Sequence, residues 1–113
     1  MKEQLATLLK TLKEDSLSFK AVIEFIETYY THEPTAFRNG ELYNEAIQNQ
    51  GSAKVFTFAQ LNKLDKADTL YLFAEHYRAV LKNPDGTDHQ NIRQFMIHGW
   101  SGVAFEGTAL LIK

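Results

Sequence analysis

The chain has 113 residues, of which 44% are hydrophobic and 23% charged, and it contains no cysteine. Its 12 Lys and Arg against 14 Asp and Glu give a formal net charge of -2, so it lacks the excess of positive charge that binding to nucleic acid needs. The lack of cysteine excludes disulfides, thiolate catalysis and cysteine-based metal sites. This length predicts one domain, residues 1–113, with a single hydrophobic core.

The sequence predicts neither a targeting segment nor a membrane span. Lysine and glutamate interrupt the leucines of residues 1–13, and no stretch approaches the ~20 apolar residues of a span. We therefore expect a cytosolic protein with no membrane partner.

The first third of the chain predicts a helical hairpin. Four leucines share one stripe of a first helix, at spacing i, i+3, i+4 and i+7: Leu5, Leu8, Leu9 and Leu12. Ser18 is placed to cap a second helix, whose apolar residues keep helical spacing as far as Tyr29 and Tyr30. We expect Pro34 to end this run, because a residue before proline avoids helical geometry.

The segment from residue 35 to 51 predicts short extended pieces around a tight turn. Asn39 and Gly40 both tolerate positive φ and lie between Phe37 and Leu42. The polar residues that follow, up to Gly51, favour no regular element.

The rest of the chain predicts three helices and then strands. A helix is expected from Ser52, and a second one, capped by Asp65, is expected to run without interruption to Leu81. After a turn at residues 83–86, Thr87 or Asp88 is expected to cap a third helix that ends at Gly99. From Trp100 we expect a terminal β-hairpin around residues 106–107. The predicted fold class is α+β, a helical hairpin followed by further helices packed on a small antiparallel β-sheet.

Several chemistries are excluded by their motifs. The serine in Gly99-Trp100-Ser101-Gly102 lacks the flanking glycines of a nucleophile elbow, and no phosphate-binding or dinucleotide-binding glycine motif is present. Residues 83–94 depart from a calcium loop at its sixth and twelfth positions. His89 and His98 are nine residues apart, so they point to opposite faces of one helix. The sequence thus predicts no cofactor and no metal.

Two polar segments are poorly explained by folding alone. Each mixes amides, carboxylates, arginine and histidine, and together they supply a candidate polar site: Arg38, Asn44, Glu45, Asn49, His76, Arg78, Asp88, His89, Asn91, Arg93, Trp100 and Glu106. One interpretation is a satisfied polar network that ties loops to helices. The other is a polar cleft that binds a ligand.

The charged members of this set are expected to lie in one region, because buried charges need partners. They are Arg38, Glu45, His76, Asp88, His89, Arg93 and Glu106. A cleft of this kind permits acid–base catalysis by Glu45 or Glu106 with His76 or His89. By contrast, we assign the aromatic residues to the core: Phe19, Tyr29, Phe58, Phe73 and Tyr77.

The second and last thirds of the chain carry long blocks that resemble the HopJ family, bacterial proteins named as type III effectors. The blocks are Pro34–Glu41, Asn44-Glu45, Gln48-Asn49, Gly51-Ser52, His76–Arg78, Pro84–Arg93, Phe95, Gly99-Trp100, Gly102 and Phe105–Gly107. The resemblance implies a single small domain and an effector role, but no reaction and no catalytic residues.

Two functions therefore remain after the sequence alone. The first is a HopJ-type effector that is secreted into a host cell and carries a polar site for a small-molecule ligand or a host protein. The second is a housekeeping enzyme of the bacterial cytoplasm that acts on a small molecule with a Glu/His pair. The leucine-striped start of the chain differs from the disordered, serine-rich segments typical of type III export signals, which keeps the second function open.

Overall fold

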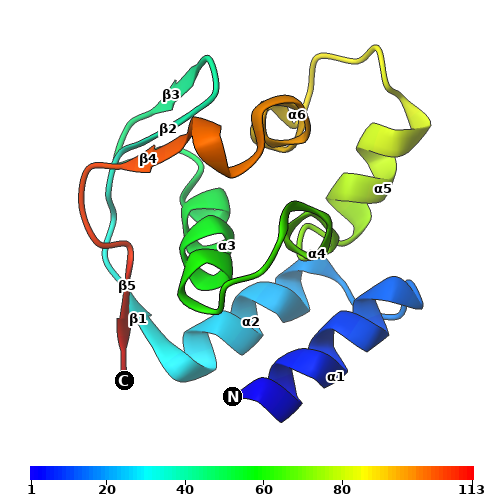
Figure 1. Ribbon diagram of the computed structural model, residues 1–113, viewed down its shortest axis with the longest axis vertical. Helices are drawn as coiled ribbons and strands as arrows, with labels where there is room; N and C mark the ends of the chain where they lie inside the picture. Colours follow the sequence, from blue (N-terminus) through cyan, green and yellow to red (C-terminus); the bar gives the residue numbers. More distant parts are fainter.

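The structure, a computed structural model, describes all residues from Met1 to Lys113. Helix α3 (Gln50–Leu61) lies at its centre, with the helical pair α1 (Lys2–Lys13) and α2 (Phe19–Tyr29) on one side and the strands on another (Figure 1). The remaining helices are α4 (Lys66–Tyr71), α5 (Glu75–Lys82) and α6 (Gln90–His98). The strands are β1 (Tyr30–His32), β2 (Phe37–Asn39), β3 (Leu42–Asn44), β4 (Val103–Phe105) and β5 (Leu110–Ile112).

The N-terminal helices form as the leucine and serine patterns predict. Leu5, Leu8 and Leu12 are buried, which makes α1 part of the core. The Ser18 hydroxyl accepts a hydrogen bond from the Ala21 N–H at 3.2 Å and so caps α2. The expected extension of α2 toward Pro34 is wrong, since the helix ends at Tyr29. The next three residues pair as β1 with β5, an arrangement that suits aromatic and β-branched side chains.

The strands form two small antiparallel sheets, one of order β1-β5 and the other of order β3-β2-β4. The predicted turn at Asn39-Gly40 is confirmed, because it joins β2 to β3, and Gly40 has a φ of +61°. A side chain at Gly40 would also collide with Gln94 and His98 of α6. The expected terminal hairpin is wrong: β4 pairs with β2 and β5 with β1, so the chain between them crosses from one sheet to the other.

The single helix expected from Asp65 to Leu81 is instead two helices with a break between them. Asp65 caps α4 as predicted, but α4 ends at Tyr71 and α5 begins at Glu75. Leu72, Phe73 and Ala74 are consecutive and all buried. The break itself is made at Ala74, whose φ of 51° and ψ of -125° cannot continue a helix.

The start of α6 also differs from the prediction. Neither Thr87 nor Asp88 caps this helix; it begins after His89, which has a φ of 53° and gives no side-chain cap. The Asp88 carboxylate binds Arg93 instead. At the other end Gly99 has positive φ, as expected of a helix terminus, and residues Gly99–Gly102 form a 3-10 turn before β4.

The core is aromatic and centred on α3. Phe56 of that helix contacts the rings of Phe37, Phe73, Phe95 and Trp100 at centroid distances between 4.9 and 6.2 Å. These partners come from β2, the break after α4, α6 and the 3-10 turn, so one side chain unites the helical and strand regions. The α+β class is therefore confirmed. No helix has both the length and the apolar character that crossing a bilayer requires.

Candidate functional site

Four asparagine side chains join the β2–β3 hairpin to the starts of α3 and α6. Asn39 and Asn44 each donate an Nδ2 hydrogen bond to Asn91 Oδ1, at 3.0 and 3.1 Å. Asn44 Oδ1 accepts from Asn91 Nδ2 at 2.9 Å and from Asn49 Nδ2 at 2.7 Å. Three of the four residues, Asn39, Asn44 and Asn91, are buried. Buried amides need partners, so this amide network fixes the hairpin against α6.

An open pocket of about 400 Å³ lies beside the amide network, and Asn49 and Asn91 belong to both. Its walls are the first residues of α3 and α6, Leu42 of β3, and three side chains from the helical region, Phe19, Phe73 and His76. We call it the α3–α6 pocket. Its volume falls in the range of roughly 300 to 1,000 Å³ that is usual for small-molecule sites.

Two histidines face each other at this pocket. The rings of His76, from α5, and His89, from the start of α6, have their centroids 4.9 Å apart and are tilted by 34°. The Phe19 ring also contacts His76, with centroids 4.9 Å apart and the rings inclined at 61°. Both histidines line the pocket and are only partly buried. Their imidazole groups are therefore within reach of a ligand.

The backbone at the pocket provides further hydrogen-bond donors. Asn49 and His89, the residues before α3 and α6, both have left-handed backbone conformations, and neither caps its helix with a side chain. The first N–H groups of a helix have no partner within the helix and carry a partial positive charge. Among the pocket's lining residues there is no Asp or Glu to neutralise it. The polar wall therefore favours negative charge.

The apolar wall is held in place by a carboxylate outside the pocket. Glu75 Oε1 accepts a hydrogen bond from the Phe19 N–H at 2.7 Å, which links the start of α5 to the start of α2. Burial acts to raise the pKa of Glu75, but hydrogen bonds from the backbone N–H groups of Phe19 and Glu75 itself outweigh it, so the pKa is lowered. Glu75 is thus held ionised, and the Phe19 ring is fixed beside His76.

Backbone strain is concentrated around the same pocket. Ala74 lies between the pocket residues Phe73 and His76 and has φ 51° and ψ -125°, a conformation that a side chain strongly disfavours. Asn49 and His89, which line the pocket, also have positive φ. Strain of this kind persists only where the surrounding structure enforces it, and it is common at binding sites.

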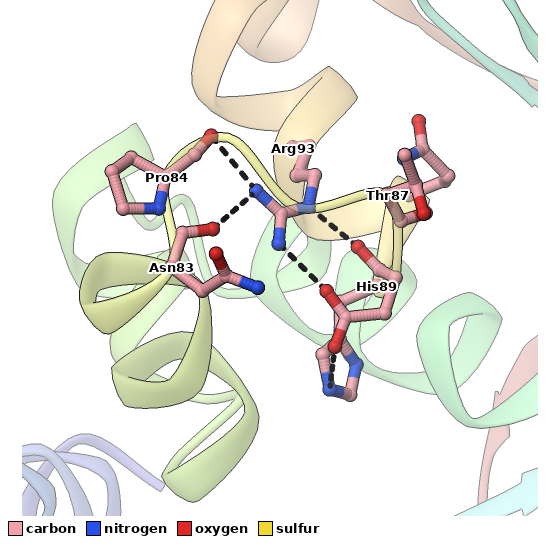
Figure 2. A network of polar contacts seen from close by, with 7 residues as sticks. Asn83, Pro84, Thr87, His89 and Arg93 are labelled. Carbon is pink, nitrogen blue, oxygen red and sulfur yellow. Dashed lines mark hydrogen bonds and ion pairs between the residues drawn. The ribbon is translucent and has the colours of Figure 1, made fainter.

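Arg93 of α6 holds together the loop that leads to His89 (Figure 2). Its Nη1 group donates to the carbonyl oxygens of Asn83 and Pro84, at 3.0 and 3.1 Å. Its Nη2 group donates to Asp88 Oδ1 at 2.7 Å, and Nε donates to the Asp88 carbonyl oxygen. We call these contacts of Arg93 with residues 83–88 the Arg93 clasp. They explain why Asp88 does not cap the helix.

Seven of the twelve residues predicted for the polar site are joined by these contacts: Asn44, Asn49, His76, Asp88, His89, Asn91 and Arg93. The other five lie in separate contacts. Arg38 is over the Tyr43 ring, and Tyr43 donates a hydrogen bond to Glu106 at 2.6 Å, all on the exposed face of the three-stranded sheet.

The remaining three are Arg78, Trp100 and Glu45. Arg78 pairs with Asp15 at 3.3 Å, and the Trp100 Nε1 group donates to the Leu64 carbonyl oxygen at 3.0 Å. Glu45 is exposed. The expectation that all the charged members share one region is therefore corrected: Arg38 and Glu106 contact Tyr43 on the exposed sheet face, and Glu45 is exposed to solvent, so none of the three needs a partner at the pocket.

Other residues of the pocket were not among the predicted site residues. Gly51 and Ser52 lie in the first turn of α3, and Phe19 and Phe73 form the apolar wall. Gly51 and Ser52 do fall in blocks that resemble the HopJ family, which was a usable signal. Phe19 was assigned to the core, and no local pattern in the sequence distinguishes a core phenylalanine from one that lines a pocket.

No three His, Asp or Glu side chains are grouped closely enough to hold a metal ion. Two polar features lie side by side here, a largely buried amide network and an open pocket with two histidines. Together they define a small α+β domain with a ligand-sized pocket at the starts of two helices.

The chain belongs to the HopJ family, since the family model described as HopJ type III effector protein matches residues 4–110. The structure is also similar to the crystal structure of VPA0580, a protein of unknown function. The two share 43% sequence identity and superpose with a TM-score of 0.88, over 96% of this chain and 92% of the other. Comparison with curated proteins finds no match.

Proposed function

We propose that this HopJ domain binds a small anionic ligand in the α3–α6 pocket. The observation that carries the proposal is the pair of imidazoles, His76 and His89, open to a pocket whose lining contains no Asp or Glu. Histidine side chains and unpaired helix N–H groups both donate hydrogen bonds to oxyanions. Phe19 and Phe73 provide a wall for an apolar or aromatic part of the same ligand.

A carboxylate or phosphate on an aromatic group matches both walls. The anion would lie at the starts of α3 and α6, near the two histidines, and the ring would lie against Phe19 and Phe73. The alternative function, acid–base catalysis by a Glu/His pair, has less support. Neither of its candidate carboxylates, Glu45 or Glu106, is among the residues that line the pocket.

The test is a titration with phenyl phosphate, benzoate and inorganic phosphate, and with benzyl alcohol as the uncharged control. Binding is followed by amide chemical shifts in NMR. We expect the two aromatic anions to shift the amides of Gly51, Ser52, Gln90 and Asn91, and benzyl alcohol to shift them little. Saturable shifts elsewhere, or none with any anion, would contradict the proposal.

Variants of the histidines make this test specific. His76→Ala and His89→Ala are each expected to weaken phenyl phosphate binding at least tenfold, because each removes a donor and part of the wall. His98→Ala is the matched control, since His98 is exposed at the far end of α6 and does not line the pocket. Equal binding by all three variants would exclude the histidine pair as the site.

We infer further that the pocket acts in a host cell after type III secretion. The support is the family's description as a type III effector protein. The test is a fusion of the chain to a calmodulin-dependent adenylate cyclase reporter, expressed in bacteria with and without a working type III apparatus. Cyclic AMP in host cells that depends on the apparatus supports secretion. Its absence would favour a role in the bacterial cytoplasm.

A further inference from the structure

The Arg93 clasp connects the surface loop of residues 83–88 to His89, which lines the α3–α6 pocket. The Arg93 side chain is 11% exposed, whereas that of Asp88 is 63% exposed. A nearly buried guanidinium thus holds an exposed carboxylate, and with it the residue directly before His89. Arginine is suited to this because its planar fork fixes several acceptors at once.

The Asp88 carboxylate faces two partners through its two oxygens. Oδ1 accepts the hydrogen bond from Arg93 Nη2 at 2.7 Å, and Oδ2 lies 3.9 Å from His89 Nε2. The hydrogen bond from Arg93 lowers the pKa of Asp88, with a smaller contribution from the charge of His89. The carboxylate is therefore ionised and fixed beside the imidazole.

His89 needs such an anchor. It has the left-handed backbone conformation that begins α6, and its ring is 31% exposed. The only charged side chain that pairs with the ring is Asp88, and its other neighbour is the ring of His76. Without Asp88, the stacking contact alone would have to keep the imidazole at the pocket.

We propose that Asp88, held by Arg93, is a positioning residue that keeps the His89 imidazole against His76 at the α3–α6 pocket. This inference rests on the proposed function only where it concerns ligand affinity. The placement of the ring is a property of the free protein and can be measured without any ligand.

The direction of the change in anion affinity distinguishes a positioning role of Asp88 from a purely electrostatic one. Asp88 carries a negative charge near an anion site, so removing that charge by itself strengthens anion binding. Loss of positioning weakens it. Asp88→Asn therefore has opposite expected outcomes under the two explanations. Asp85→Asn is the matched control, because it makes the same charge change in the same loop at an exposed residue that has no contact with Arg93.

The experiment measures two quantities for the wild type, Asp88→Asn, Asp85→Asn and Arg93→Lys. The first is the nuclear Overhauser contact between the His76 and His89 rings in the free protein. The second is the dissociation constant for phenyl phosphate. For Asp88→Asn we expect a weakened ring contact and a dissociation constant raised about fivefold, which corresponds to roughly 1 kcal/mol. Arg93→Lys should behave in the same way, because lysine keeps the charge but not the fork.

An unchanged ring contact in Asp88→Asn would overturn the positioning role, whatever the affinity does. Tighter phenyl phosphate binding by both aspartate variants would likewise overturn it in favour of simple charge repulsion. If the wild-type protein binds none of the anions, the proposed function fails, but the ring contact still decides whether Asp88 positions His89. The two proposals can thus fail separately.

Discussion

The amide network and the α3–α6 pocket are adjacent and share Asn49 and Asn91. They differ in how many of their polar groups have hydrogen-bond partners within the protein. In the network, amides bond to one another at 2.7 to 3.1 Å, and its central residues are buried. At the pocket, two imidazoles meet only each other, an aromatic ring and a carboxylate 3.9 Å away.

This difference separates structure from function within one polar cluster. A buried network whose amides bond chiefly to one another stabilises the contact between elements; only the Asn39 Oδ1 atom is buried in it without a partner. An open pocket with unpaired donors contributes less to folding, and its donors remain able to bond to another molecule. The network thus fits the first of the two interpretations that the sequence left open, and the pocket is where we propose the second, a cleft that binds a ligand.

The largest effect on stability is expected from breaking the network. Asn91→Ala removes both side-chain hydrogen bonds between Asn91 and Asn44, and it removes one of the two acceptors of Asn39, which keeps its 2.7 Å bond to the Asn91 carbonyl oxygen. We expect the free energy of unfolding to fall by about 1 to 3 kcal/mol, the usual cost of leaving a buried polar group unsatisfied. Urea unfolding measures this. Asn83→Ala, at an exposed asparagine, is the control, and an equal loss in both would contradict the comparison.

A smaller effect of opposite sign is expected at the edge of the pocket. Ala74→Gly relieves a backbone strain of about 3 kcal/mol. It loses roughly 0.8 kcal/mol of methyl burial and a similar amount to chain entropy. We expect a net stabilisation of about 1 kcal/mol, measured by urea unfolding.

Ala79→Gly is the matched control for this substitution, since Ala79 is exposed within α5. There glycine should destabilise by roughly 1 kcal/mol, the usual cost in a helix. Destabilisation at both positions would show that the Ala74 backbone is not strained. In that case only Asn49 and His89 would remain as candidates for backbone strain around the pocket.

The Arg93 clasp is expected to depend on pH. The pKa of Asp88 is lowered in the folded protein, chiefly by the hydrogen bond from Arg93. Its contribution to stability is therefore present above the ordinary range of aspartate and is lost as the pH falls through the lowered value.

The difference in Tm between the wild type and Asp88→Asn should accordingly be largest near neutral pH and should close in acid. Thermal unfolding at a series of pH values measures it. Asp85→Asn should show no such closing difference. A gap that stays constant down to the lowest pH at which the protein folds would exclude ionised Asp88 as the partner that matters.

The sequence predicts local features well where one residue determines them. Ser18 and Asp65 cap their helices, and Asn39-Gly40 makes the turn, because each depends on the chemistry of its own neighbourhood. The break at Ala74 and the partners of β4 and β5 depend on what the rest of the chain buries. No local pattern contains that information.

The candidate site shows the same division. The sequence singled out His76, His89 and Asn91 by residue type, but it could not tell which polar side chains would meet. Arg38 and Glu106 have the same chemistry as Arg93 and Asp88, and only the positions of the strands place them on the exposed sheet face. Phe19 reaches the pocket because Glu75, 56 positions later in the chain, binds its N–H group.

The smallest effect on stability is expected at the exposed face of the three-stranded sheet. A short hydrogen bond is exposed to solvent there, so the effect of bond length can be separated from the effect of burial. The Tyr43 hydroxyl donates to Glu106 at 2.6 Å, a shorter bond than any in the amide network, but Tyr43 is 44% exposed. The hydrogen bond to Glu106, followed by desolvation, raises the pKa of Tyr43. Glu106→Gln should therefore shift the Tyr43 titration, followed by tyrosinate absorbance against Tyr43→Phe, to lower pH.

Tyr43→Phe itself should leave urea unfolding within the scatter usual for surface substitutions, because water replaces the lost hydroxyl as a donor to the exposed Glu106 carboxylate. If Tyr43→Phe instead destabilises the protein as much as Asn91→Ala, then bond length rather than burial governs these contributions. The division between a structural network and a pocket proposed to bind a ligand would then lose its physical basis. If only Asn91→Ala destabilises it, burial without an alternative partner is what makes the network structural, and exposure to solvent is what leaves the histidine pair available to a ligand.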